Sequence, residues 1–159
     1  MTIPIKIISK KDYIKNNKKP NQEKVWDNIA KPWEKYVVKK IPSVEAFLKY
    51  KKGKIIDIGC GTGRNMIPNP KIEYTAIDFS TKQITKTKDY IKDNKVNARA
   101  IKAKASDLSK FKDNTFDHGL FVASLHCIET KEERELALKE LYRVLKPKAK
   151  ALITTWNSN

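Results

Sequence analysis

Apolar residues along this chain gather in short runs that are separated by polar and glycine-rich turns. The clearest run, residues 54–58, ends in alternate glycines, which indicates a buried parallel strand whose C-terminal end turns sharply. Further runs predict strands over residues 72–78, 98–103, 115–123 and 149–156. We therefore expect one sheet built from these five segments.

Apolar residues with helical spacing occupy the intervals before and between the strands. Residues 22–30 carry one apolar stripe and predict a short helix that Pro32 ends. Trp26 and Trp33 are candidates for the core or for a lid, and as isolated aromatic residues they favour the core. A second helix begins near Pro42, a residue suited to the first turn of a helix, and stops at Gly53.

Two capping-box sequences mark the starts of two longer helices. Ser80-Thr-Lys-Gln83 opens a lysine-rich surface helix, and Thr130-Lys-Glu-Glu133 opens a helix that Lys146-Pro147 closes. The expected buried stripe of the latter consists of Leu138, Leu141, Tyr142 and Leu145.

This order of strands and helices predicts an α/β fold with a mainly parallel sheet and right-handed crossovers. The connection after the glycines is short, because Pro68 and Pro70 leave room for only about a turn of helix. We expect a basic N-terminal arm over residues 1–21 and a single domain over residues 22–159.

Composition narrows the class of protein. The chain has 159 residues, of which 40% are hydrophobic, and no long apolar run that would cross a membrane or act as a secretory signal. Two cysteines make neither a disulfide framework nor a metal set, so we expect no metal and a cytoplasmic location.

Charge is the strongest compositional feature. Thirty-four Lys and Arg residues against 18 Asp and Glu give a formal net charge of +16, which favours a polyanionic partner such as nucleic acid. The alternative is that genome composition or habitat enriched lysine without any nucleic-acid function.

The segment Asp57-Ile-Gly-Cys-Gly-Thr-Gly63 carries the chemistry. Glycines with this spacing let the backbone approach a bound group closely. Asp78, at the end of the next predicted strand, suits a pair of ligand hydroxyls because hydrogen bonds to a carboxylate are charge-assisted. The spacing departs from the G-x-G-x-x-G fingerprint of dinucleotide-binding proteins.

These residues resemble the first motif and the ribose-binding acid of class I S-adenosylmethionine-dependent methyltransferases, which have a Rossmann-like three-layer fold. The resemblance implies that S-adenosylmethionine is the cofactor, with the adenine near residues 104–107. The implied cofactor-binding residues are Tyr36, Asp57, Gly59, Cys60, Gly61, Gly63, Asp78, Phe79, Ala105, Ser106, Asp107 and Ala123.

Flanking segments narrow the resemblance over roughly residues 25–157. Leu125-His-Cys-Ile128, Glu140-Leu-Tyr-Arg-Val-Leu-Lys-Pro147 and Ala151-Leu-Ile-Thr-Thr-Trp-Asn157 are similar to the wobble-uridine tRNA methyltransferase family. That family esterifies a carboxymethyl group on carbon 5 of uridine 34. It implies tRNA as a partner and, from the eukaryotic members, a small zinc-binding activator protein.

Class I methyltransferases usually continue with a helix and two antiparallel strands beyond the fifth strand. Their absence here indicates a fragment or a minimal domain, and an open apolar edge strand leads us to expect a covering partner or segment.

A carboxylate acceptor needs alignment and desolvation rather than a strong general base, so few catalytic side chains are expected. His126 is the candidate for orienting the acceptor, whereas His118 inside a strand is expected to be structural. Lys39 and Lys40 are expected to bind substrate phosphates.

Two other functions remain open at this point. The same core serves many small-molecule methyltransferases, since a fold does not fix its substrate. A chain that lacks the last strands is also compatible with a non-catalytic subunit that binds cofactor or RNA.

Overall fold

A computed structural model describes residues 21–36 and 41–156, with the side chains of residues 33–36 excepted. The predicted basic arm therefore lies outside the described residues, apart from Asn21. No helix in the described part of the chain is both long and apolar enough to span a bilayer.

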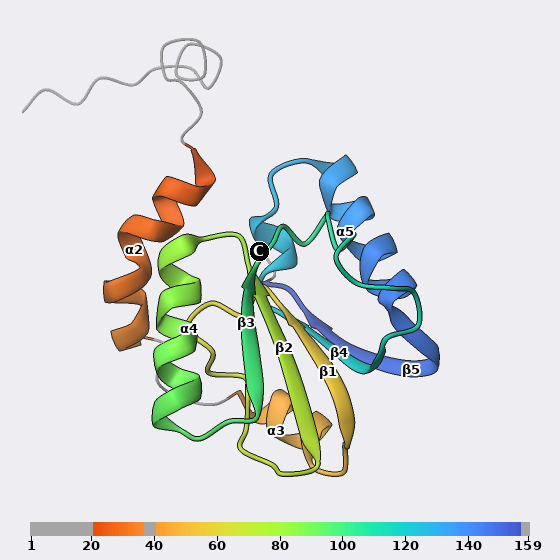
Figure 1. The fold of residues 1–159 in the computed structure, drawn as a ribbon. Helices are drawn as coiled ribbons and strands as arrows, with labels where there is room; N and C mark the ends of the chain where they lie inside the picture. The colour runs from red at the N-terminus through yellow and green to blue at the C-terminus, as the bar shows by residue number, and fades with distance from the viewer. Residues whose placement is uncertain (1–20, 37–40, 157–159) are drawn as a thin grey trace, which may run out of the picture.

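The described residues form a five-stranded parallel sheet in the order β3-β2-β1-β4-β5, with helices on both faces (Figure 1). This confirms the predicted fold class. The strands are β1 (Gly53–Ile58), β2 (Ile72–Asp78), β3 (Ala98–Lys102), β4 (Phe116–Val122) and β5 (Leu145–Thr154). The helices are α2 (Gln22–Tyr36), α3 (Pro42–Leu48), α4 (Thr81–Asp93) and α5 (Lys131–Val144), with a 3₁₀ turn η1 (Leu125–Cys127).

Two apolar clusters fill the space between the layers. On one face, Val44 of α3 and Ile84 of α4 pack with Ile55 and Tyr74 of the sheet. The other face is covered by α5, whose buried residues Ala137, Leu141 and Val144 pack with Ile56, Ile58 and Phe121. Alternate residues of β1 thus enter opposite clusters, as the period of a strand requires.

Helix α2 lies against α4 rather than on the sheet (Figure 1). The Asp27 carboxylate accepts a hydrogen bond from the Ser80 hydroxyl at 2.6 Å and another from the Lys82 amide at 3.0 Å. An ion pair between Glu23 and Lys102 joins the same helix to β3. These contacts hold α2 over the C-terminal ends of the strands.

The predicted end of α2 at Pro32 is wrong, because the helix continues through Pro32 to Tyr36. A proline removes one backbone hydrogen bond and crowds the preceding turn. Asn28, whose carbonyl loses that bond, is exposed, so water can replace the missing donor. The crowding of the turn before Pro32 still costs free energy, and the packing of α2 against α4 offsets it.

Two C-terminal expectations also change. Strand β5 starts at Leu145 rather than Ala149, directly after α5, and its pairing with β4 is irregular before Lys150. The exposed fractions of Leu138 and Tyr142 are 36% and 84%, so the expected stripe of α5 is rotated toward Ala137 and Val144. Leu141, which belongs to both stripes, packs over Gly119 of β4, where a Cβ would lie 2.9 Å from Leu141 Cδ1.

Both predicted capping boxes are confirmed at their first residues. The Ser80 hydroxyl accepts from the Gln83 amide at 3.1 Å, and the Thr130 hydroxyl accepts from the Glu133 amide at 3.1 Å. Ser80 is buried, whereas Thr130 is exposed. The Ser80 hydroxyl therefore does two things: it caps α4 and ties α4 to α2.

Strand β1 carries one buried charged residue, Asp57, which is fully inaccessible to solvent. Neither of its carboxylate oxygens has a hydrogen bond of ordinary geometry among the described residues. Burial raises the pKa of Asp57 from 3.8 to about 7, with a further rise from Asp78, while Asn65 and Arg64 act in the opposite direction.

Replacing Ser80 with alanine should destabilise the fold by about 2 kcal/mol, because a cap and a buried hydrogen bond are lost together. Thr130→Ala is the matched control and should cost about 1 kcal/mol, since only the cap is removed. Urea unfolding of both variants measures the difference. Equal losses would show that the bond from Ser80 to Asp27 contributes nothing.

The pKa of Asp57 predicts a distinctive pH dependence of stability. Between about pH 4 and pH 7 the folded chain holds a proton on Asp57 that the unfolded chain releases, so the contribution of Asp57 to stability falls as pH rises. Across this range the free energy of unfolding of the wild type should fall by at most about 4 kcal/mol relative to that of Asp57→Asn. Urea unfolding across this range tests it, with the exposed Asp89→Asn as control. A constant difference between wild type and Asp57→Asn would contradict the raised pKa.

Candidate functional site

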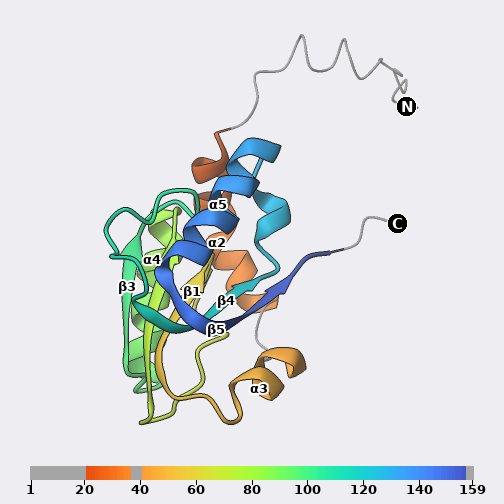
Figure 2. The ribbon, with the colours of Figure 1, turned by 90° about the vertical axis from the view of Figure 1, so that its right-hand side faces the viewer.

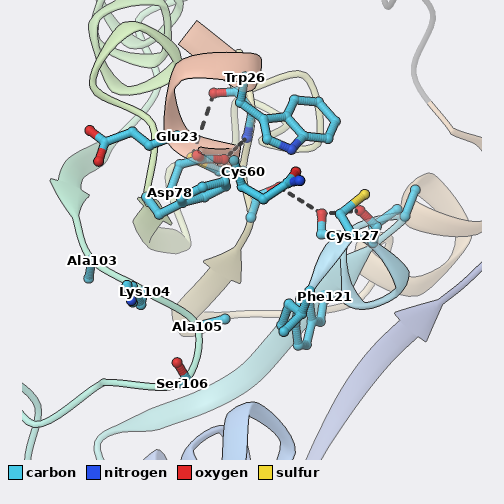
Figure 3. Close-up of a pocket in the computed structure, with 18 of the residues that line it drawn as sticks. Glu23, Trp26, Cys60, Asp78, Ala103, Lys104, Ala105, Ser106, Phe121 and Cys127 are labelled. Carbon is cyan, nitrogen blue, oxygen red and sulfur yellow. Dashed lines mark hydrogen bonds between the residues drawn. The ribbon is translucent and has the colours of Figure 1, made fainter. Parts of the chain in front are cut away.

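A cavity of about 540 Å³ opens at the C-terminal ends of the strands. Its walls come from the loops after β1, β2, β3 and β4 and from the start of α2 (Figure 3). In an open α/β sheet this edge is where ligands bind, at the point where the strand order reverses, here between β1 and β4. The volume lies in the ordinary range for a small-molecule site.

The turn after β1 forms the floor of the cavity. Its three glycines share a backbone conformation that favours glycine, but they differ in the space around them. Gly59, Gly61 and Gly63 all have positive φ, at 65°, 56° and 95°. A Cβ on Gly59 would lie 2.6 Å from the Ser124 side chain, and one on Gly63 would lie 3.1 Å from Tyr90. A Cβ on Gly61 would meet no atom within 4 Å. Gly61 is therefore the place where open space reaches the backbone.

Asp78 closes β2 and lines the same cavity. Its carboxylate accepts from the Ser80 amide at 2.9 Å and from the Gly61 amide at 3.0 Å, which fixes it beside the glycine turn. Burial raises the pKa of Asp78 to about 6, and the backbone donors limit the rise. A carboxylate that is oriented but largely desolvated suits hydroxyl donors from a ligand.

The structure brings most of the predicted cofactor-binding residues together. Those that line the cavity are Gly59, Cys60, Gly61, Asp78, Phe79, Ala105, Ser106 and Ala123. Asp57, Gly63, Asp107 and His126 are described but do not line it. Asp57 and Gly63 are both buried.

Residues 103–106, after β3, form the wall of the cavity opposite the carboxyl end of β4 (Figure 3). Asp107 is exposed, and its carboxylate accepts from the amide and hydroxyl of Ser109 at 3.2 and 2.6 Å. Of the candidates for contacting an adenine, Ala105 and Ser106 thus have the required position. A direct contact from Asp107 remains a prediction.

His126 is exposed on η1, between the cavity-lining residues Ser124 and Cys127. His118 is elsewhere: it packs edge-on against Phe47, with ring centroids 6.2 Å apart. The predicted residues Lys39 and Lys40 lie outside the described residues, as does the side chain of Tyr36. Their roles, and that of His126 toward the acceptor, stay predictions.

Helix α2 contributes three lining residues, Gln22, Glu23 and Trp26, of which Glu23 and Trp26 are labelled in Figure 3. Trp26 belongs to neither core cluster, so of its two expected places the cavity is favoured over the core. Glu23 and Trp26 are three residues apart and share one face of the helix. That spacing was visible in the sequence, but the direction of the face depends on how α2 docks on α4.

Charged residues that the sequence analysis left unassigned also line the cavity. Arg64 follows the glycine turn directly, and burial lowers its pKa while Asp57 partly offsets this. Glu129 and Glu133 approach from the loop before α5 and its first turn. The lining thus contains more carboxylates than cations, which favours a ligand with positive charge.

Within residues 21–36 and 41–156, no cluster of acidic, His or Cys side chains is arranged to hold a metal ion.

The two cysteines contribute small, unreactive side chains. Cys60 is buried, and its Sγ lies 3.5 Å from the Thr87 hydroxyl. Burial raises the pKa values of both Cys60 and Cys127, so neither thiol is set up as a nucleophile.

Comparison with known proteins agrees with this geometry. A family profile described as "Methyltransferase domain" matches residues 56–153. A tRNA (carboxymethyluridine(34)-5-O)-methyltransferase from Arabidopsis thaliana is 32% identical over 135 residues, covering 84% of this chain but 32% of that protein. The chain therefore spans about a third of the length of this curated relative.

Solved structures give the same result for the fold. A SAM-dependent methyltransferase from Methanosarcina mazei is 28% identical with a TM-score of 0.55, over 67% of this chain and 53% of that one. Another from Aquifex aeolicus, 22% identical, has a TM-score of 0.65 over 89% of this chain and 76% of that one.

The resemblance drawn from the glycine motif and its flanks is thereby confirmed, as is the expected cofactor. Since the profile match extends over more than half of the chain, the chain belongs to the methyltransferase domain family and is a domain of the S-adenosylmethionine-dependent class I type.

Proposed function

We propose that this chain methylates tRNA at the wobble uridine, forming a methyl ester on a carboxymethyl group at carbon 5. The observation that carries the proposal is the similarity, over 84% of the chain, to a relative named for that reaction. The net charge of +16 supports a polyanionic substrate, because lysines near a phosphate backbone release its counterions on binding.

The residues of the cavity fit S-adenosylmethionine. Asp78 is placed to accept the ribose hydroxyls, and Gly61 leaves open space at the backbone beside it. The amides of Ala105 and Ser106 are suited to the adenine, and the carboxylates of Glu129 and Glu133 favour a cationic group. When bound, the cofactor supplies a methyl group on a positively charged sulfur.

A carboxylate acceptor is already nucleophilic at neutral pH, so the chain has no proton to remove. Its residues must align the acceptor with the cofactor and exclude water. Arg64 and Lys104 are the two cations that line the cavity in the described part of the chain, and either is suited to an acceptor carboxylate. His126, beside the opening, keeps its proposed role in orienting the acceptor.

We also propose that a partner protein covers the open edge of the sheet at β5. Strand β5 is an edge strand of the described sheet, and its residue Ile153 is 41% exposed, as are Leu136 and Leu138 of α5 by 46% and 36%. An open edge beside apolar side chains is an association site. A small zinc-binding activator protein, as the resemblance implies, would satisfy it, and tRNA assays should include one.

Asp78→Ala should weaken binding of S-adenosylhomocysteine at least about tenfold, because charge-assisted hydrogen bonds to the ribose are lost. Calorimetric titration measures the affinity, with Asp89→Ala, at an exposed position of α4, as the matched control.

Because burial raises the pKa of Asp78 to about 6, wild-type affinity should also fall as pH drops below 6. The isosteric Asp78→Asn should remove that pH dependence. Unchanged affinity in both variants would exclude Asp78 from the site.

Labelled methyl groups should enter tRNA whose uridine 34 carries a 5-carboxymethyl group and should not enter the same tRNA with plain uridine. The second substrate lacks only the acceptor carboxylate, so it isolates the proposed chemistry. Raising salt from about 50 to about 200 mM should weaken tRNA binding steeply, whereas binding of S-adenosylhomocysteine should change little. Equal labelling of both tRNAs, or of neither with and without a partner, would refute the proposed reaction.

A further inference from the structure

Trp156 follows β5 and is 63% exposed. Its indole lies against the imidazole of His126, with ring centroids 5.2 Å apart and an interplanar angle of 28°. His126 is itself exposed. Two stacked aromatic rings therefore stand in solvent, outside both core clusters.

Strand pairing places this pair at the carboxyl edge of the sheet, the edge on which the cavity lies. Thr154 is opposite Val122 in the parallel pair of β5 and β4, and the Ala123 amide donates to the backbone carbonyl of Thr154 at 3.0 Å. Trp156 thus lies just past the carboxyl edge of the sheet, level with η1. Figure 2 shows the end of β5 reaching out beyond the other strands. Ser124 and Cys127, on either side of His126 along the chain, line the cavity.

Packing within the described residues does not account for this arrangement. A tryptophan in a core would bury most of its surface, and this one leaves most of it in water. The contact with His126 instead orients the indole, and most of the indole surface stays exposed. An oriented, exposed aromatic ring at the edge of the sheet where the cavity lies suits a flat ligand, and nucleobases of any identity stack on such rings.

We propose that Trp156, held by His126, is the stacking platform on which the acceptor nucleobase rests while its substituent enters the cavity. Trp156 is thus a positioning residue, and His126 acts at least partly by orienting it. This inference rests on the proposed function in taking a nucleic-acid base as the acceptor. It adds a residue and a role for which the cavity lining alone gives no indication.

The first test needs no methyl transfer. A short oligouridylate is titrated into the full chain while tryptophan emission is followed, and binding is measured separately by anisotropy of the labelled RNA. Stacking on Trp156 should quench emission in the wild type, and Trp156→Phe should remove most of the quenching while preserving binding. Quenching that survives in Trp156→Phe would come from another tryptophan and would overturn the proposal.

The second test uses the carboxymethylated tRNA. Trp156→Ala should raise KM for tRNA by roughly five- to a hundredfold, and Trp156→Phe should restore it to within about threefold of wild type. Affinity for S-adenosylhomocysteine and thermal stability should not change. Tyr142→Ala, which removes an exposed aromatic ring from α5, is the matched control and should leave all values as in wild type.

The outcomes separate the two proposals. A wild type that labels no tRNA refutes the proposed reaction, and the oligouridylate titration then decides the role of Trp156 by itself. A Trp156→Ala variant that matches wild type overturns the platform alone. A variant that loses cofactor affinity and stability together with tRNA binding, without recovery in Trp156→Phe, shows that Trp156 only covers apolar surface.

Discussion

The turn after β1 is the constraint on which the rest of the site depends. Its glycines hold positive φ where a Cβ on Gly59 would collide with Ser124 from the loop after β4. The Gly61 amide donates to Asp78, so the end of β2 is fixed by the end of β1. Ser80 then links Asp78 to the cap of α4 and, through Asp27, to α2. One short turn thereby sets the position of three cavity walls.

Charge is arranged in two opposite ways in this molecule. The whole chain is strongly cationic, yet the cavity contains Glu23, Asp78, Glu129 and Glu133, with Asp57 buried beneath. A carboxylate-lined interior favours the sulfonium and ammonium groups of the cofactor, and a cationic exterior favours a polyanion. Both features are consistent with the proposed transfer of a methyl group from a cationic donor to an anionic substrate.

The mistaken expectations share a cause. The pattern around α5 offered two apolar faces, one with Leu138 and Tyr142 and one with Ala137 and Val144, and periodicity does not choose between them. Packing on the sheet makes the choice, because Ala137, Leu141 and Val144 enter the apolar cluster on that face. In the same way, Pro32 ends a helix only if nothing else holds it, and α4 holds α2. Trp26 and Trp156 were single aromatic residues whose surroundings no local pattern reveals.

Sequence alone determined the strand segments, the capping residues and the chemistry of the cofactor site, because these depend on neighbours a few residues apart. The glycine motif and the position of Asp78 carried the resemblance to class I methyltransferases, and that resemblance implied the methyl donor. Tertiary structure alone decided which faces of α2 and α5 are buried, that Glu23 and Arg64 enter the cavity, and that His126 meets Trp156. Those contacts join residues up to dozens of positions apart, and their geometry arises only when the layers dock on the sheet.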